Sequence, residues 1–202
     1  MQTTVFYHAK HLTVKARFLC PQSDQELSLQ TTVRTRKDYW SITALSPINV
    51  AGACKFPPSI DIVDITGRRL RTIEGEQNGV HIFKQPSFLA SMNGNILVTD
   101  RQEKTLVCID QAGEVKFVHK STSRDEQSHP RGVCTDQNNR AYLVDGPNVF
   151  MLSSEGKVQC QLLTCLPDPR AITVGKDNLM AVSMDGRGVT FFTLSELKGP
   201  YN

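Results

Sequence analysis

A four-residue phrase recurs four times in this chain and constrains its fold more than any other feature. The copies are Trp40-Ser-Ile-Thr43, Pro86-Ser-Phe-Leu89, Pro130-Arg-Gly-Val133 and Pro169-Arg-Ala-Ile172, which start 46, 44 and 39 positions apart. A second marker, Asp64-Ile-Thr-Gly67, Asp110-Gln-Ala-Gly113 and Ser153-Ser-Glu-Gly156, recurs at spacings of 46 and 43. Because the two markers stay in phase, they indicate one repeated structural unit. A period of about 40 to 50 residues made of short strands is typical of β-propeller blades.

The second repeat shows the expected strands of one blade most clearly. Its strands are predicted over residues 87–90, 96–99, 105–109 and 114–118. Gly94 and Asn95 suit the turn between the first two strands because both residues tolerate positive φ. In the last strand, apolar and charged side chains alternate, which is typical of a strand with one solvent-facing side. The other repeats follow the same order with almost no helical periodicity, so the sequence predicts an all-β fold.

The repeats divide the chain into four blades and a remnant. The blades are expected to begin near residues 40, 86, 130 and 169 and to occupy residues 40–202, with the last blade incomplete. Residues 1–39 are expected to form a partial N-terminal blade. A propeller ring must close, and six blades of this size would need roughly 260 residues. Either about four blades close tightly, or the chain is a fragment of a larger propeller, which we favour.

Composition and charge exclude several classes of protein. The formal net charge of +3 is too small to indicate binding to DNA or to a membrane surface. No apolar run could span a bilayer, and the N-terminal residues lack the layout of a secretory signal, so a cytoplasmic location is expected. The six cysteines include no CxxC pair, which argues against structural zinc. In a reducing compartment they are expected to remain free thiols.

The repeats resemble those of NHL-repeat propellers. The shared features are a proline before the first strand, Gly-Asn before the second, Asp after it and Asp-x-x-Gly before the fourth. The best local matches are Gly94-Asn-Ile-Leu-Val-Thr-Asp100, Asp110-Gln-Ala-Gly113, Pro130-Arg-Gly-Val133 and Tyr142-Leu-Val-Asp145. More narrowly, residues 39–44 and 56–67 are similar to the C-terminal propellers of tripartite-motif (TRIM) proteins. WD40 and kelch repeats fit less well, because the Gly-His, Trp-Asp and Gly-Gly signatures are absent.

The resemblance implies a recognition domain rather than an enzyme. In TRIM proteins a RING finger, B-boxes and a coiled coil precede the propeller, and the whole resembles an E3 ubiquitin ligase. None of those zinc modules is in this chain. Relatives bind protein targets or structured RNA across one face of the propeller. We therefore expect a non-catalytic domain that binds a protein target, with RNA as the second class of partner, no cofactor and no small-molecule ligand.

Catalytic motifs are absent from the sequence, which holds no HExxH, GxSxG, Walker P-loop or GxGxxG. Asp100, Asp145 and Asp185 recur at equivalent positions, and we interpret them as turn residues that bind backbone amides rather than as a carboxylate cluster. The alternative function is a calcium-dependent hydrolase of the SMP-30/gluconolactonase type, with a metal ion in the central channel. Two arginines at the channel mouth, Arg131 and Arg170, oppose a cation there, so this hypothesis is the weaker one.

The arginines that follow the entry prolines are the main candidate binding residues. Arg131 and Arg170 are expected to be exposed on the face where the connections between blades emerge, and guanidinium groups bind phosphate and carboxylate well. The same face is expected to carry Arg101, Lys104, Arg124, Arg187 and Trp40. Trp40 either anchors a partner or packs within its blade. Acidic residues on the same loops reduce the net charge of this face, which favours a protein partner over RNA.

Overall fold

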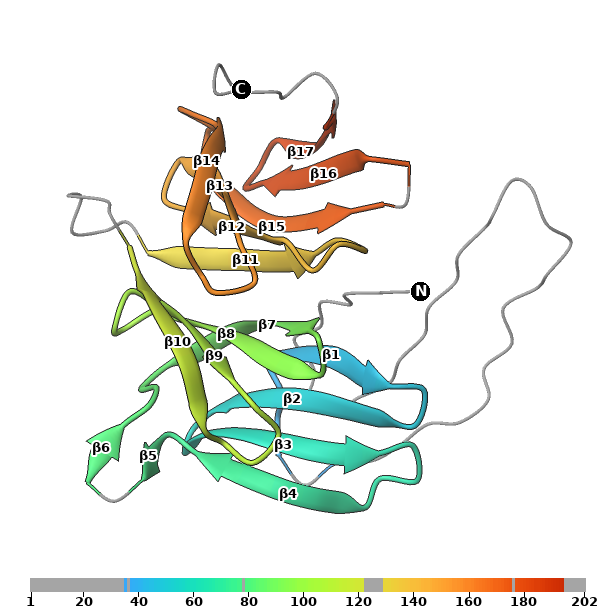
Figure 1. Cartoon of the computed structure of the whole chain (residues 1–202), viewed down its shortest axis with the longest axis vertical. Coiled ribbons are helices and arrows are strands. Elements are labelled where there is room, and N and C mark those ends of the chain that lie inside the picture. The colour runs from blue at the N-terminus through green and yellow to red at the C-terminus, as the bar shows by residue number, and fades with distance from the viewer. Residues whose placement is uncertain (1–34, 36, 78, 122–128, 176, 195–202) are drawn as a thin grey trace, which may run out of the picture.

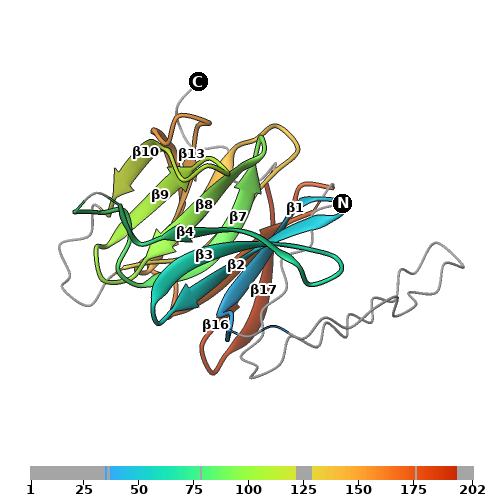
Figure 2. The same ribbon diagram turned by 90° about the horizontal axis from the view of Figure 1, so that it is seen from below.

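The computed structural model describes residues 35, 37–77, 79–121, 129–175 and 177–194. In this part of the chain all the regular secondary structure is β-strand, arranged as four successive antiparallel sheets and one short hairpin. Figure 1 shows the sheets following one another along the long axis of the molecule, from blue to red. Figure 2 shows from below that the sheet of β1 to β4 and the sheet of β7 to β10 are separate layers. The all-β prediction is therefore confirmed for the described residues.

Neighbouring strands within each sheet are also neighbours in the sequence. Sheet 1 contains β1 (Ser41–Ser46), β2 (Asn49–Lys55), β3 (Pro58–Asp64) and β4 (Arg69–Glu74). Sheet 2 contains β7 (Pro86–Met92), β8 (Asn95–Asp100), β9 (Thr105–Ile109) and β10 (Val115–Lys120). Sheet 3 contains β11 (Pro130–Thr135), β12 (Ala141–Asp145), β13 (Asn148–Leu152) and β14 (Val158–Leu163). Sheet 4 contains β15 (Pro169–Val174), β16 (Leu179–Met184) and β17 (Gly188–Thr193).

The proline of the first marker begins the first strand of a sheet. Pro86, Pro130 and Pro169 are the first residues of β7, β11 and β15, and β1 begins one residue after Trp40. These four first strands lie side by side in chain order. Each of them pairs with a strand on one side only, and a proline is tolerated at the first residue of such an edge strand.

The second marker forms the same turn three times, between the third and fourth strands. The side chains of Asp64, Asp110 and Ser153 each accept hydrogen bonds from the backbone N–H groups two and four residues later. The glycine of the turn has a positive φ, for example 94° at Gly113. At Gly156 there is also no room for a side chain, since a Cβ atom would lie 2.3 Å from the ring of Phe117 in sheet 2. The regular spacing of this marker along the sequence therefore reflects both the turn and the packing of successive sheets.

The hydrophobic core consists of clusters between successive sheets. Ile96 and Val98 of β8 pack in the cluster shared with sheet 1, while Leu97 between them packs in the cluster shared with sheet 3. This burial on both faces explains the continuous apolar run in the second strand. Between sheets 3 and 4 the backbones approach closely, because a Cβ atom on Gly132 would lie 2.7 Å from the Cα of Ala171.

The outer faces of sheets 1 and 4 differ. On sheet 1, Tyr39 packs on Gly52 with Cys54 and Val63 and covers part of the face turned away from sheet 2. In sheet 4, β17 pairs with β16, and among the described residues no strand pairs with its other edge. Most of the expected N-terminal blade over residues 1–39 lies outside the described residues. The number of blades in the whole fold stays a prediction.

Two details go beyond the sequence analysis. A hairpin of β5 (Glu76–Gln77) and β6 (Val80–His81) is inserted in the connection between sheets 1 and 2. The cysteines that the structure describes are free thiols, as expected: Cys54, Cys108, Cys134, Cys160 and Cys165. Cys20 lies outside the described residues.

Candidate binding face

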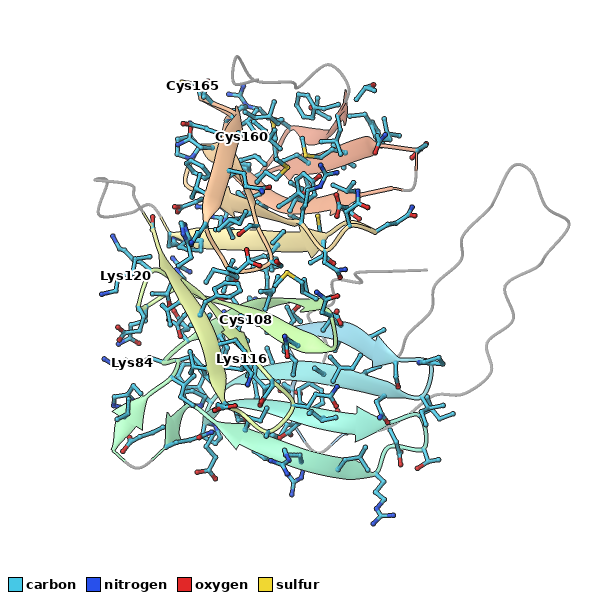
Figure 3. The ribbon with its side chains drawn as sticks, in the orientation of Figure 1. Lys84, Cys108, Lys116, Lys120, Cys160 and Cys165 are labelled. Atoms are coloured by element: carbon cyan, nitrogen blue, oxygen red, sulfur yellow. The ribbon has the colours of Figure 1, made fainter. Side chains whose placement is uncertain are left out.

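The predicted site residues come together at one end of the sheets, which we call the loop face. It is formed by the segments that enter each first strand and by the turns between the second and third strands. Arg101 and Lys104 lie in the β8–β9 turn, Arg187 lies in the β16–β17 turn, and Trp40 precedes β1. Lys84, just before β7, and Lys120, at the end of β10, also project there (Figure 3). Arg124 lies outside the described residues.

Arg131 and Arg170 belong to one network of ion pairs between sheets 3 and 4. The Arg131 guanidinium donates to Asp168 Oδ1 and, at 3.0 Å, to the carbonyl of Pro169. The Arg170 guanidinium donates to Asp168 Oδ2 at 2.8 Å and to Asp185 Oδ2 at 2.6 Å. The hydrogen bond from Arg131, reinforced by both positive charges, lowers the pKa of Asp168. Alternating charges therefore run across this part of the loop face.

The expectation that both arginines are freely exposed is wrong for Arg131. Its side chain is only 16% exposed, whereas that of Arg170 is 45% exposed. The reason is the close approach of β11 and β15, which places Arg131 against the segment that enters β15. Sequence reasoning missed this because Asp168 is 37 residues away in the chain. Arg131 thus connects sheets 3 and 4 through its hydrogen bonds, and Arg170 is the more accessible of the two.

The other end of the loop face carries an aromatic and cationic group. The Lys55 Nζ lies 3.4 Å from the centre of the Trp40 ring, which is the geometry of a cation–π contact. Trp40 is 41% exposed, so its ring is both stacked by lysine and open to solvent. Burial and the nearby charge of Arg101 lower the pKa of the Lys55 ammonium. Lys55 and Arg101 form no ion pair with a carboxylate of the described residues.

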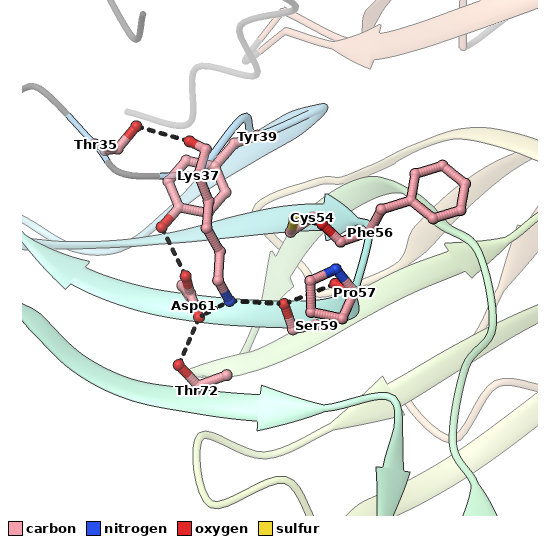
Figure 4. A network of polar contacts seen from close by, with 9 residues as sticks. All are labelled: Thr35, Lys37, Tyr39, Cys54, Phe56, Pro57, Ser59, Asp61 and Thr72. Atoms are coloured by element: carbon pink, nitrogen blue, oxygen red, sulfur yellow. Dashed lines mark hydrogen bonds and ion pairs between the residues drawn. The ribbon is translucent and has the colours of Figure 1, made fainter. Parts of the chain in front are cut away.

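Phe56 follows Lys55 and lies in the turn between β2 and β3. Its side chain is 81% exposed and points away from the neighbouring polar network (Figure 4). The Phe56–Pro57 peptide bond is cis. Beside it is a recess of about 350 Å³. Its walls include Pro57, Phe83 and Lys84.

The recurring aspartates have different partners. Asp100 confirms the interpretation as a turn residue, since its carboxylate accepts hydrogen bonds from the backbone N–H groups of Lys84, Gln85 and Glu103. Asp145 accepts a hydrogen bond from the Ser121 hydroxyl, and Asp185 accepts one from Arg170. Within the described part of the chain, no group of three or more His, Cys, Asp or Glu side chains could hold a metal ion.

A buried polar network lies beside the loop face on the outer side of sheet 1 (Figure 4). Asp61 of β3 is fully buried and binds the Lys37 ammonium at 3.2 Å, the Tyr39 hydroxyl at 2.8 Å and the Thr72 hydroxyl at 2.7 Å. Burial and the hydrogen bond to Asp61 raise the pKa of Tyr39. The network fixes the segment that leads into Trp40. Sequence analysis missed it, and the only signal was an aspartate among the apolar residues of β3.

No helix formed by the described residues has the length and hydrophobicity that crossing a membrane would require.

Comparison with known proteins identifies the fold but no family. No protein-family model matches the chain, and no curated protein matches it either. Among solved structures, it is similar to the WD40 β-propeller domain of Doa1, with a TM-score of 0.62 and 14% identity, over 78% of this chain and 51% of that one. The chain is also similar to a candidate gluconolactonase, with a TM-score of 0.58 and 15% identity, over 78% of this chain and 60% of that one.

Virginiamycin B lyase from Staphylococcus aureus is a third similar structure, with a TM-score of 0.56 and 16% identity, over 83% of this chain and 58% of that one. This chain therefore spans between half and three fifths of these structures. At such low identity the likeness concerns the fold alone, and the three proteins differ in activity. The described chain is an all-β protein of successive antiparallel sheets with a β-propeller-like fold.

Proposed function

We propose that this chain is a non-catalytic recognition domain that binds a protein target through its loop face. The proposal includes the NHL type of the repeats and a role at the substrate-recognition end of a TRIM-like E3 ubiquitin ligase in the cytoplasm. It rests on the resemblance of the repeats and on the chemistry of the loop face.

The exposed pair of aromatic residues on sheet 1 is the observation that carries the proposal. Trp40 and Phe56 are 41% and 81% exposed. Both lie at the same end of sheet 1. Trp40 precedes β1, and Phe56 lies in the turn between β2 and β3, directly after Lys55. Large aromatic side chains contribute much of the binding energy at protein interfaces, because they bury a large area with few rotatable bonds.

The charge pattern favours a protein over RNA. An RNA-binding surface needs a continuous row of free cations along the phosphate backbone. At Lys84 and along the Arg131–Arg170 part of the loop face, cations alternate with carboxylates. Asp168 and Asp185 bind the two arginines, and Glu103 binds Lys84 at 2.6 Å. Such alternation suits the mixed polar rim of a protein interface.

Affinity capture from a lysate of the source cells tests the proposal. The test variant is Trp40→Ala with Phe56→Ala. Its matched control is Ile48→Ala with Ile65→Ala, since these exposed apolar residues lie in turns at the opposite end of sheet 1. We expect the wild type and the control to capture the same proteins after ribonuclease treatment, and the test variant to lose them while it melts at the same temperature as the control.

Two results would overturn the proposal. Partners that disappear on ribonuclease treatment indicate an RNA-binding domain. Equal capture by the test variant and the control places the interface elsewhere. The association with a ligase has its own test, which is to sequence the gene upstream of Met1 and look for RING, B-box and coiled-coil segments.

A further inference from the structure

Two cations lie together on the loop face, and no carboxylate of the described residues forms an ion pair with either. Lys55 is the last residue of β2, and Arg101 follows the last residue of β8. Strand β2 lies against β7, the strand that pairs with β8, so the two strand ends meet where sheets 1 and 2 join. In the described structure neither side chain forms an ion pair with a carboxylate. By contrast, Arg131, Arg170, Lys84 and Lys37 all have carboxylate partners.

This arrangement costs free energy in the unbound protein. Partial burial of the Lys55 ammonium, together with repulsion from the Arg101 charge, disfavours its charged form and lowers its pKa. The Trp40 ring offsets part of the cost, because its face attracts the ammonium at 3.4 Å. The backbone N–H of Arg101 donates to the carbonyl of Gln85 at 3.1 Å, which fixes the start of the turn that bears it. A ligand with negative charge would relieve the repulsion.

The repeat places the two cations at equivalent positions of successive sheets. Lys55 and Arg101 are 46 residues apart, which is also the spacing between Trp40 and Pro86. Each follows a buried residue of the second strand, Cys54 in sheet 1 and Asp100 in sheet 2. The Asp100 carboxylate accepts hydrogen bonds from the backbone N–H groups of Lys84 and Gln85.

We propose that Lys55 and Arg101, with the Trp40 ring against the lysine, form a site for a carboxylate-rich segment of a protein partner. This inference rests on the proposed function, because it assigns the anionic part of the same interface. Arginine and lysine form charge-assisted hydrogen bonds to carboxylates, and Trp40 and Phe56 take the apolar side chains on either side. The preferred ligand is an acidic peptide in which aspartate or glutamate residues flank an aromatic or aliphatic residue.

A random 12-residue peptide display library tests the proposal with a defined probe. We expect the wild-type chain to select peptides enriched in Asp and Glu. The double variant Lys55→Met with Arg101→Gln removes both charges and keeps a long lysine-like stem against Trp40. It should bind the best synthetic peptide about tenfold more weakly, as expected for the loss of charge-assisted contacts.

The control variant is Lys157→Met with Arg68→Gln, since these exposed residues lie in turns at the opposite end of the sheets. It should bind the same peptide as the wild type does, and the three proteins should have similar melting temperatures. Selected peptides without acidic enrichment, or equal binding by the double variant, would overturn the inference. Displacement of the acidic peptide by a twelve-residue uridine RNA at lower concentration than the unlabelled peptide itself would also overturn it.

Failure here is distinguishable from failure of the proposed function. If the Lys55/Arg101 variant captures every cellular partner and only the Trp40/Phe56 variant loses them, the loop face binds protein without this anionic subsite. If both variants capture all partners, the loop face itself is the wrong surface.

Discussion

Arg131 of β11 and Asp168, the residue before β15 in the sequence, form an ion pair that joins sheets 3 and 4. The same guanidinium donates to the carbonyl of Pro169, so it links β11 to the start of the next first strand. Its neighbour Arg170 binds the same carboxylate from a more exposed position. The two arginines, which are equivalent in the sequence repeat, are therefore expected to have unequal effects on stability.

We predict that Arg131→Gln lowers the free energy of unfolding by about 1–3 kcal/mol, since a partly buried charge-assisted contact is lost and Asp168 keeps only one partner. Arg170→Gln should change it by less than about 1 kcal/mol, because exposed ion pairs contribute little. Urea unfolding of the two variants measures the difference. Equal effects would mean that Arg131 does not hold the sheets together.

Removal of the buried carboxylate on sheet 1 is expected to be more damaging. Asp61→Asn leaves the Lys37 ammonium without its counter-charge in a partly buried position, and breaking such a pair costs about 3–5 kcal/mol. Asp185→Asn is the control, because its carboxylate is exposed and its ion pair is with the exposed Arg170. Thermal melting should separate the two variants clearly. If Asp61→Asn has the same melting temperature as the wild type, the network contributes nothing to stability.

The repeat could be predicted from the sequence because its markers depend on local chemistry. The turns that begin at Asp64 and Asp110 close through hydrogen bonds within five residues, and the entry prolines need only a free strand edge. The ion pairs of Arg131 and Arg170 and the proximity of Lys55 to Arg101 could not be predicted, because both depend on how successive sheets approach one another. Trp40 was a candidate from the sequence, but its lysine partner depends on the register of β1 against β2.

The turn between β11 and β12 contains Asp136, a carboxyl group that we expect to contribute to the pH dependence of stability. Burial alone would raise the pKa of Asp136, but hydrogen bonds from the backbone and guanidinium of Arg140 and from the Tyr142 hydroxyl lower it instead. A carboxyl whose pKa is lower in the folded state stabilises the protein above its unfolded pKa of about 3.9, and this stabilisation is lost as the pH falls toward the folded pKa.

We therefore predict that the free energy of unfolding of the wild type falls below about pH 4, and that Asp136→Asn is less stable at neutral pH but shows a smaller decline. Urea unfolding measured at several pH values between neutral and acid tests this. Parallel curves for the two proteins would show that Asp136 is not one of the groups responsible.

In the described part of the chain no strand pairs with the outer edge of β17 in sheet 4, and this edge is expected to promote self-association. Strand β17 carries the exposed side chains of Val189 and Phe191 and has no charged residue between Gly188 and Thr193. Unpaired apolar edges of this kind pair with other strands, and a lysine there prevents such pairing. We predict that the wild-type chain self-associates at micromolar concentration and that Phe191→Lys shifts it toward monomer. Sedimentation velocity distinguishes the two, and a wild type that is already monomeric would contradict the prediction.

Site-specific photocrosslinking tests the central claim, that the loop face is the surface that binds a protein, most directly. A photoreactive phenylalanine analogue is placed at Phe56 in one protein and at Ile65, an exposed residue in a turn at the opposite end of the same sheet, in another. Both are irradiated in ribonuclease-treated lysate of the source cells. The account predicts discrete crosslinked proteins from position 56 and none of the same bands from position 65. The same bands from both positions, or bands from position 65 alone, would contradict it.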